Sequence, residues 1–173
     1  MTAARVTLPV LDARIEARAR ATREAHPWWP CAKGCDLCCR SLPRLPEISA
    51  PEWERLREAL SRLDARRIGE ITSRIRSAPA EGPLTCPMLD RDQGACLVYD
   101  ARPVACRTYG FYTDRDAGLH CGEVLWRVEE RAGDDPVVWG NGEAIAEDVR
   151  SFGEPVSLRD WLEVPAPPTP GRG

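Results

Sequence analysis

Hydrophobic side chains recur at intervals of three and four residues along much of this chain, the spacing typical of amphipathic helices. The first such stripe consists of Leu8, Leu11, Ile15 and Ala19, with charged side chains among the positions between them. It predicts a helix from residue 8 to about residue 25, because the His-Pro pair at residues 26 and 27 disfavours its continuation.

The next helical stripe follows a recognisable start signal. Ser49 and Glu52 have the spacing of a capping box, in which each side chain accepts a hydrogen bond from the other residue's backbone N–H. Ile48 can pack on Trp53 as a hydrophobic staple. Leucine and isoleucine side chains then continue at helical spacing, which predicts helix to about residue 76 with a break near Asp64.

The pattern changes to that of a β-hairpin between residues 86 and 99. Two short runs containing Cys86 and Cys96 flank a turn-like Arg-Asp-Gln-Gly sequence, so we expect these cysteines to lie close across the strands. Asp100 as a cap and Pro103 as an early-turn residue then predict a short helix that carries Cys106 and stops at the glycine at position 110.

The remaining pattern is weaker. It predicts a helix at 123–132 closed by Gly133, a short strand at 136–139, a helix at 142–152 and one further turn at 157–162. Residues 165–173 have too little apolar surface to fold, so we expect a disordered tail. The predicted fold class is mainly α with a small β-hairpin, a compact cysteine-rich domain over residues 31–164 on which an N-terminal helix within residues 1–30 packs.

Composition and charge narrow the class of protein. The chain has 173 residues, of which 29% are charged, and it contains no apolar run of membrane-spanning length. The first ten residues lack the pattern of an export signal, so we expect a cytoplasmic protein with no membrane partner. Residues 1–80 hold 15 basic against 10 acidic side chains, but these are interleaved and the sequence pI is about 5.5, which argues against a nucleic-acid partner.

Eight cysteines are the main chemical signal, and four of them fall within nine residues. Thiols stay reduced in the cytosol, so metal or redox chemistry explains this number better than a disulfide framework. The short spacings, with Gly34 to allow a tight turn, let two thiols fold onto one ion. The candidate metal ligands are Cys31, Cys35, Cys38, Cys39, Cys86, Cys96, Cys106 and Cys121.

The adjacent pair Cys38 and Cys39 raises the question of how many ions are bound. Neighbouring side chains point about 100° apart in a helix and about 180° apart in a strand, so we expect them not to share an ion. Either two metal centres use this loop, or one of the pair is an unligated thiol. His120, beside Cys121, is a weaker candidate ligand for the same geometric reason.

Other residues near the cysteines suggest supporting roles. Arg40, Arg102 and Arg107 could lower thiol pKa values and offset thiolate charge, although a salt bridge for Arg102 or a helix C-terminal charge for Arg107 fits equally well. The indoles of Trp28 and Trp29 could exclude water from a metal site, or could pack in an ordinary core.

These motifs resemble a known family. The sequence Cys31-x3-Cys35-x2-Cys38-Cys39, followed by Cys86-Pro-x-Leu and Gly94-x-Cys96-x-x-Tyr99-x-x-Arg102-Pro103-x-x-Cys106-Arg107, is similar to the cysteine-cluster family of CxxCxxCC type, also called YkgJ-like. The resemblance spans roughly residues 31 to 121 and implies chelation of zinc or iron. One branch of the family is similar to flagellin lysine methylases, but no methyl-donor-binding motif is visible in this sequence.

Three functions are compatible with these residues. The first is a metal-binding protein that chelates zinc or iron through the cysteine cluster, as two four-thiolate sites or as one iron-sulfur cluster with additional thiols. The second is an iron-sulfur-dependent enzyme of redox or methyl-transfer type, with Tyr99, Tyr109 and Tyr112 lining a pocket. The third is a protein-interaction adaptor with a purely structural metal. The sequence identifies no catalytic residue and no protein partner.

Overall fold

The computed structural model describes residues 6–115, 121–131 and 135–164, and its framework is mainly helical, as predicted. The helices are α1 (Leu8–Ala25), α2 (Leu37–Arg40), α3 (Ala50–Leu60), α4 (Ala65–Ser77), the 3-10 helix η1 (Tyr99–Ala101), α5 (Val104–Thr108), α6 (Gly122–Glu130), α7 (Gly142–Arg150) and α8 (Leu158–Glu163). The strands are β1 (Glu47–Ile48), β2 (Leu89–Asp90), β3 (Ala95–Cys96), β4 (Tyr112–Thr113), β5 (Gly140–Asn141) and β6 (Val156–Ser157).

The strands form three two-stranded sheets, each of which joins segments next to the helices. Strands β2 and β3 make the predicted antiparallel hairpin, with Leu89 opposite Cys96. Strands β1 and β6 pair antiparallel, and β4 and β5 pair parallel. The sheets are too short to form a layer of their own, so they only connect segments that flank the helices.

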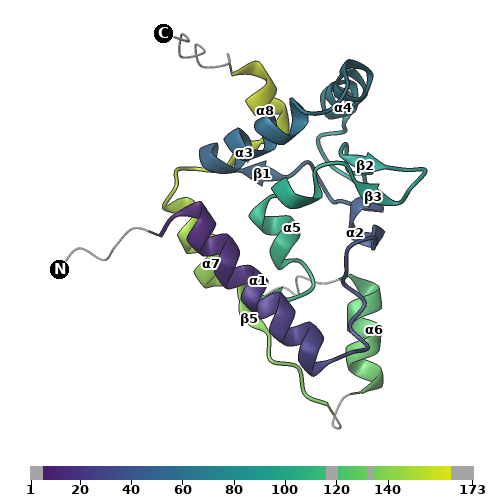
Figure 1. The fold of residues 1–173 in the computed structure, drawn as a ribbon, viewed down its shortest axis with the longest axis vertical. Helices are drawn as coiled ribbons and strands as arrows, with labels where there is room; N and C mark the ends of the chain where they lie inside the picture. Colours follow the sequence, from purple (N-terminus) through teal and green to yellow (C-terminus); the bar gives the residue numbers. More distant parts are fainter. Residues whose placement is uncertain (1–5, 116–120, 132–134, 165–173) are drawn as a thin grey trace, which may run out of the picture.

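Buried side chains fall into two clusters. The first, here called the hairpin core, lies among α3, α4, α8 and the hairpin, and contains Leu45, Ile48, Trp53, Leu56, Ile71, Ile75, Leu84, Cys86, Met88, Leu89, Val98, Ala101 and Leu158. The second, the α1 core, contains Leu8, Leu11, Ile15, Ala19, Trp29, Val104, Phe111, Tyr112, Val124 and Ile145. Figure 1 shows the elements of the hairpin core above those of the α1 core, with α5 between them.

The carboxylates of Glu52 and Asp12 connect elements of the hairpin core with elements of the α1 core. Glu52 is 2% exposed; its Oε2 accepts hydrogen bonds from the backbone N and the Oγ of Ser49, at 2.9 and 2.6 Å. Its Oε1 accepts a third from the backbone N of Val104 at 2.8 Å, so one side chain caps both α3 and α5. Asp12 of α1 pairs with Arg55 of α3 and, at 3.4 Å, with Arg107 of α5.

The strongest local predictions are confirmed. Helix α1 has the expected bounds, the capping box of Ser49 and Glu52 is formed, and α3 and α4 are separated at Asp64. Asp64 begins α4 by accepting a hydrogen bond from the backbone N of Arg67 at 2.9 Å. These features depend on neighbouring residues only, which is why the sequence pattern was sufficient.

Two local predictions were wrong. Asp100 lies in η1, and Pro103 is the residue that precedes α5. The strand expected at residues 136–139 is instead β5, which lies against β4 so closely that a Cβ on Gly140 would come within 2.4 Å of the Tyr112 ring. Only glycine fits at this position. The register of β5 is set by its pairing with β4, which is distant in the sequence, so the local pattern could not predict it. Gly133, His120 and the tail lie outside the described residues.

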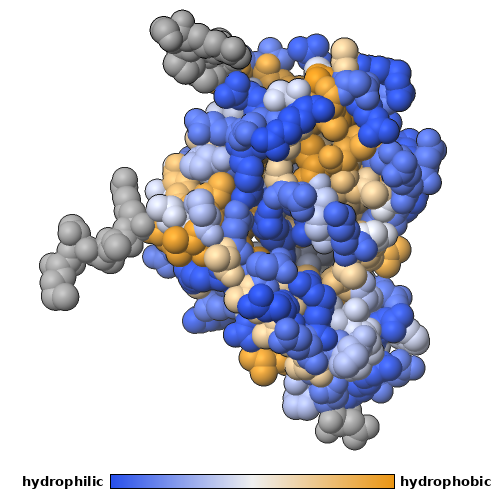
Figure 2. Space-filling view, in the orientation of Figure 1, coloured by the Kyte–Doolittle hydropathy of each residue, from blue (hydrophilic) through white to orange (hydrophobic). Residues whose placement is uncertain are grey.

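The visible surface is largely hydrophilic. Figure 2 shows hydrophilic side chains over most of this face, with hydrophobic ones gathered in the upper part, between α8 and α4. Within the described ranges, no helix combines the length and apolar character needed to cross a bilayer.

Candidate metal centre

All eight cysteines line two adjoining cavities. The large cavity has a volume of about 540 Å³, and the small cavity about 60 Å³. Cys31 and Cys121 line only the large cavity; Cys39, Cys86 and Cys96 line only the small one; and Cys35, Cys38 and Cys106 line both. Every one of these is a free thiol. The fold therefore gathers side chains that are up to 90 positions apart in the sequence.

Local backbone structure places the first four cysteines. Cys35 closes a turn by donating its backbone N–H to the carbonyl of Ala32 at 3.1 Å, and Gly34 in that turn has a φ of 97°, which disfavours any side chain. Cys38 and Cys39 follow on α2. The turn thus directs Cys31 and Cys35 to the large cavity before the chain enters the short helix.

Long-range pairing places the others. The backbone N of Cys86 donates to the carbonyl of Cys39 at 2.7 Å, which brings the start of the hairpin segment against α2. Cys96 lies on β3 and Cys106 on α5. Cys86 and Cys96 both line the small cavity, but Cys86 precedes β2, and Leu89 is the residue opposite Cys96 in the hairpin.

Cys38 and Cys39 are closer than expected. Their sulfur atoms are 4.0 Å apart, whereas the sequence argument had the two side chains pointing away from each other. Four sulfurs bound to one zinc ion at 2.3 Å would be about 3.8 Å apart. The sequence argument took only the direction of the Cα–Cβ bonds, and side-chain torsions bring the two sulfurs closer than that direction alone suggests. That the two thiols do not share an ion stays a prediction.

Burial and mutual repulsion raise the pKa values of Cys31 and Cys106 and so favour their neutral form. Burial, followed by the charges of Cys121, Cys35 and Cys38, raises the pKa of Cys31 to about 12. Burial, followed by Cys39, Cys38 and Cys96, raises the pKa of Cys106 to about 12. Among the described residues, no three Cys, His, Asp or Glu side chains are already arranged to hold one ion. A metal would therefore replace protons and draw the sulfurs together.

Comparison with protein families finds one family that matches the chain. Residues 30–127 match the CxxCxxCC family, described as a putative zinc- or iron-chelating domain. The chain belongs to this family. The matched range contains all eight cysteines and extends from the cysteine-bearing turn into α6, whereas α1 and Leu158, which complete the lining of the two cavities, lie outside it. No curated protein and no solved structure matches the chain.

Of the three arginines singled out in the sequence, Arg102 is the one whose charge affects the pKa values of thiols in the CxxCxxCC domain. Its positive charge partly offsets the effects that raise the pKa values of Cys38, Cys96 and Cys106. Its guanidinium lies 3.6 Å from the centre of the Tyr99 ring. Arg40 is exposed and pairs with Asp36 at 2.5 Å instead. Arg107 is held by Asp12 and by the carbonyls of residues 100 and 102.

Trp28 and Trp29, which precede the CxxCxxCC domain, have separate roles. Trp29 is 6% exposed and packs on Phe111 and Trp139 in the α1 core, against which Cys31 also packs. Trp28 donates its indole N–H to Asp135 at 2.8 Å. The same carboxylate oxygen lies 2.7 Å from Nδ1 of His26, so Asp135 holds this histidine outside both cavities.

Sequence reasoning missed part of this environment. Gly110 was expected only to stop a helix, but its φ is 84° and a Cβ there would lie 2.6 Å from the Cys31 sulfur. Tyr99 and Tyr109 line the large cavity, whereas Tyr112 is 5% exposed in the α1 core and lines neither cavity. No local pattern distinguishes these tyrosines, because distant segments decide which of them face the thiols.

Proposed function

We propose that this chain binds zinc or iron through two groups of cysteine thiolates. The inner group, Cys39, Cys86, Cys96 and Cys106, surrounds the small cavity; the outer group is Cys31, Cys35, Cys38 and Cys121, at the large cavity. The division of the eight thiols between the two cavities is the observation that carries the proposal. Membership of a family of zinc- or iron-chelating domains supports the choice of metal.

Two groups explain the arrangement better than one cluster. A four-iron cluster takes four thiolates and would leave the other four without a role. Cys31 and Cys121 line only the large cavity, and Cys39, Cys86 and Cys96 only the small one, so a single centre would not use both sets. Cys38, 4.0 Å from Cys39, lies where the two groups meet and can exchange between them.

The surroundings suit a closed inner site. Leu56, Met88, Val98 and Leu158 line the small cavity beside its thiols, and its volume of about 60 Å³ leaves room for an ion but for little else. Structural zinc sites are closed in this way and bind with free energy that stabilises the fold. The inner metal would thereby hold α2, the hairpin and α5 together.

Metal analysis of single variants tests the proposal. Protein purified without oxygen is expected to contain two metal equivalents per chain by elemental analysis. Cys86→Ser should remove the inner metal and Cys31→Ser the outer one, so each variant should retain about one equivalent. Ser73→Ala, at an exposed position of α4, is the control and should retain both.

Other results would overturn the proposal. Full metal content in both cysteine variants would show that these thiols are not ligands. Four irons per chain with the visible absorbance of an iron-sulfur cluster would instead support the iron-sulfur alternative, with a single centre.

A further inference from the structure

The large cavity is much larger than an ion requires. At about 540 Å³ it has nine times the volume of the small cavity, and it falls within the range of roughly 300–1,000 Å³ typical of small-molecule sites. The lining of the small cavity is mainly apolar, whereas the large cavity has four basic side chains and several aromatic ones. Metal binding alone does not account for that space.

The charged side chains of the large cavity are mainly basic. Arg23, Lys33, Arg102 and Arg107 line it, against only two carboxylates, which gives these side chains a net charge of +2. Arg23 is neutralised by Glu16 at 2.9 Å. Arg107 is likewise paired, because Asp12 and backbone carbonyls hold it.

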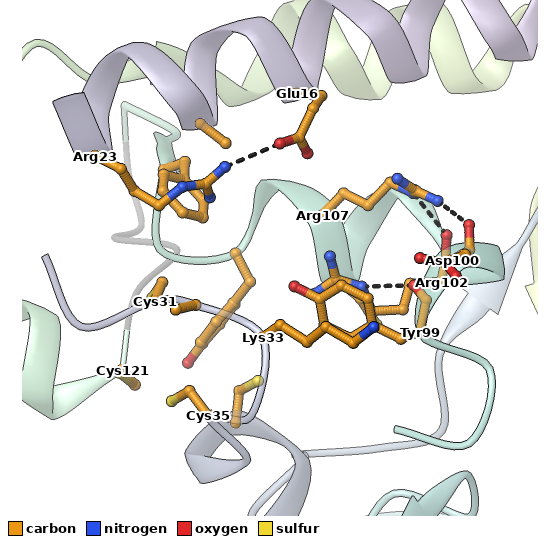
Figure 3. A pocket seen from close by; sticks show the side chains of 16 residues that line it. Glu16, Arg23, Cys31, Lys33, Cys35, Tyr99, Asp100, Arg102, Arg107 and Cys121 are labelled. Carbon is orange, nitrogen blue, oxygen red and sulfur yellow. Dashed lines mark hydrogen bonds and ion pairs between the residues drawn. The ribbon is translucent and has the colours of Figure 1, made fainter. Parts of the chain in front are cut away.

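Lys33 and Arg102 differ from the other two cations. Within the described ranges, neither has a carboxylate at ion-pair distance. Both lie on the same aromatic ring: Nζ of Lys33 is 5.2 Å and the guanidinium carbon of Arg102 3.6 Å from the centre of Tyr99. Figure 3 shows this group on the side of the cavity opposite the thiols of Cys31 and Cys121.

We propose that the large cavity binds a small molecule that carries a carboxylate or phosphate group, with Lys33 and Arg102 as the residues that hold the anionic end. Tyr99 fixes the position of both cations, since a ring face attracts positive charge. Arginine supplies a planar pair of donors and lysine a mobile one, a combination suited to either type of anion. The proposal rests on the proposed function in placing this ligand beside the outer metal.

Neutralisation of the thiolates is the competing explanation for these cations. Arg102 serves both purposes, because it faces both cavities. Lys33 separates the two explanations: it lines the large cavity only, its side chain is exposed, and it is the only lysine of the chain. Its replacement should disturb the binding of an added anion without unfolding the protein.

Calorimetric titration of the metal-loaded full chain tests the assignment. Succinate and inorganic phosphate serve as probes because they chelate metals weakly, and succinamide is the uncharged control. Saturable binding with a Kd on the order of 1 mM or tighter is expected for at least one anion. Whichever binds more tightly identifies the carboxylate or the phosphate as the preferred group.

Variants connect that binding to Lys33. Lys33→Gln should weaken it on the order of tenfold, Lys33→Arg should restore it, and Arg62→Gln on the exposed surface should leave it unchanged. Equal binding of succinate and succinamide, no saturable binding of either anion, or unchanged binding by Lys33→Gln would overturn the assignment. Metal content is measured on the same samples, so absence of anion binding by the unaltered chain at full metal content contradicts this inference alone, whereas absence of metal contradicts the proposed function.

Discussion

The two cavities share three thiols but differ in what else surrounds them. Most of the other side chains around the small cavity are apolar, and its volume is about 60 Å³. Around the large cavity, of about 540 Å³, they include three arginines, a lysine and aromatic rings, although Tyr99 and Arg102 line both cavities. The same type of side chain therefore occurs in a small, mainly apolar cavity and in a large, mainly basic one. Thiol number and spacing do not distinguish these settings; the residues packed around the thiols do.

Removal of metal should have the largest effect, and it should be larger at the inner group. A strong chelator is expected to lower the free energy of unfolding by several kcal/mol, because metal binding contributes folding free energy in such sites. Thermal unfolding followed by circular dichroism measures the loss. Cys86→Ser should reproduce most of the loss and Cys31→Ser less of it; the reverse order would contradict the contrast between a closed and an open site.

Gly110→Ala should damage the outer group selectively. The added Cβ would lie 2.6 Å from the Cys31 sulfur at a φ of 84°, so the variant should lose about 1–3 kcal/mol of stability and the outer metal. Elemental analysis should find one metal equivalent remaining. Gly69→Ala, inside α4 with nothing within 4 Å of the new Cβ, is the matched control and should be neutral or slightly stabilising.

Asp12→Asn should weaken the connection between the two cores. Its carboxylate pairs with arginines from α3 and α5 at a site that is 21% exposed, so the loss should be about 1–3 kcal/mol. Chemical denaturation measures it. Asp148→Asn removes an ion pair with the exposed Arg14 and should cost at most about 1 kcal/mol. Similar losses in the two variants would show that the Asp12 pairing is no more than a surface interaction.

Arg102→Gln should change the pH at which metal is released, with the smallest effect on the fold. Arg102 lowers the pKa values of Cys38, Cys96 and Cys106, so its removal raises them and lets protons compete better for the thiolates. The midpoint of metal release on acidification should therefore move to higher pH. Arg40→Gln, which removes an exposed pair with Asp36, should not move it.

How much the sequence could predict depended on the range of the interactions. The start of α3 followed from Ser49 and Glu52, three positions apart, and the hairpin from its turn residues. The sequence predicted that all eight cysteines would be ligands, which stays a prediction. It could not predict the distance between Cys38 and Cys39, since that depends on side-chain torsions.

The rest of the site arises from contacts between distant segments. Arg23 on α1 and Arg102 after η1 line the same cavity although 79 positions separate them, and no periodic pattern carries that information. The proximity of Gly110 to Cys31 is of the same kind. A family resemblance predicts the donor atoms, but the cavity volume and its charge had to come from three-dimensional structure.

The carboxylate of Glu52 holds the first turns of both α3 and α5, so the start of α5 is fixed by protein contacts. Cys106, one of the proposed ligands, follows two residues after Val104 and would therefore be held near its place before an ion arrives. The entropy of ordering this ligand is then lost during folding rather than during binding. A hydrated ion that reaches such a thiol exchanges its water for a ligand already in position. If Cys106 is a ligand, as proposed, the rate at which the chain captures metal would depend on the first turn of α3, a helix that carries no cysteine.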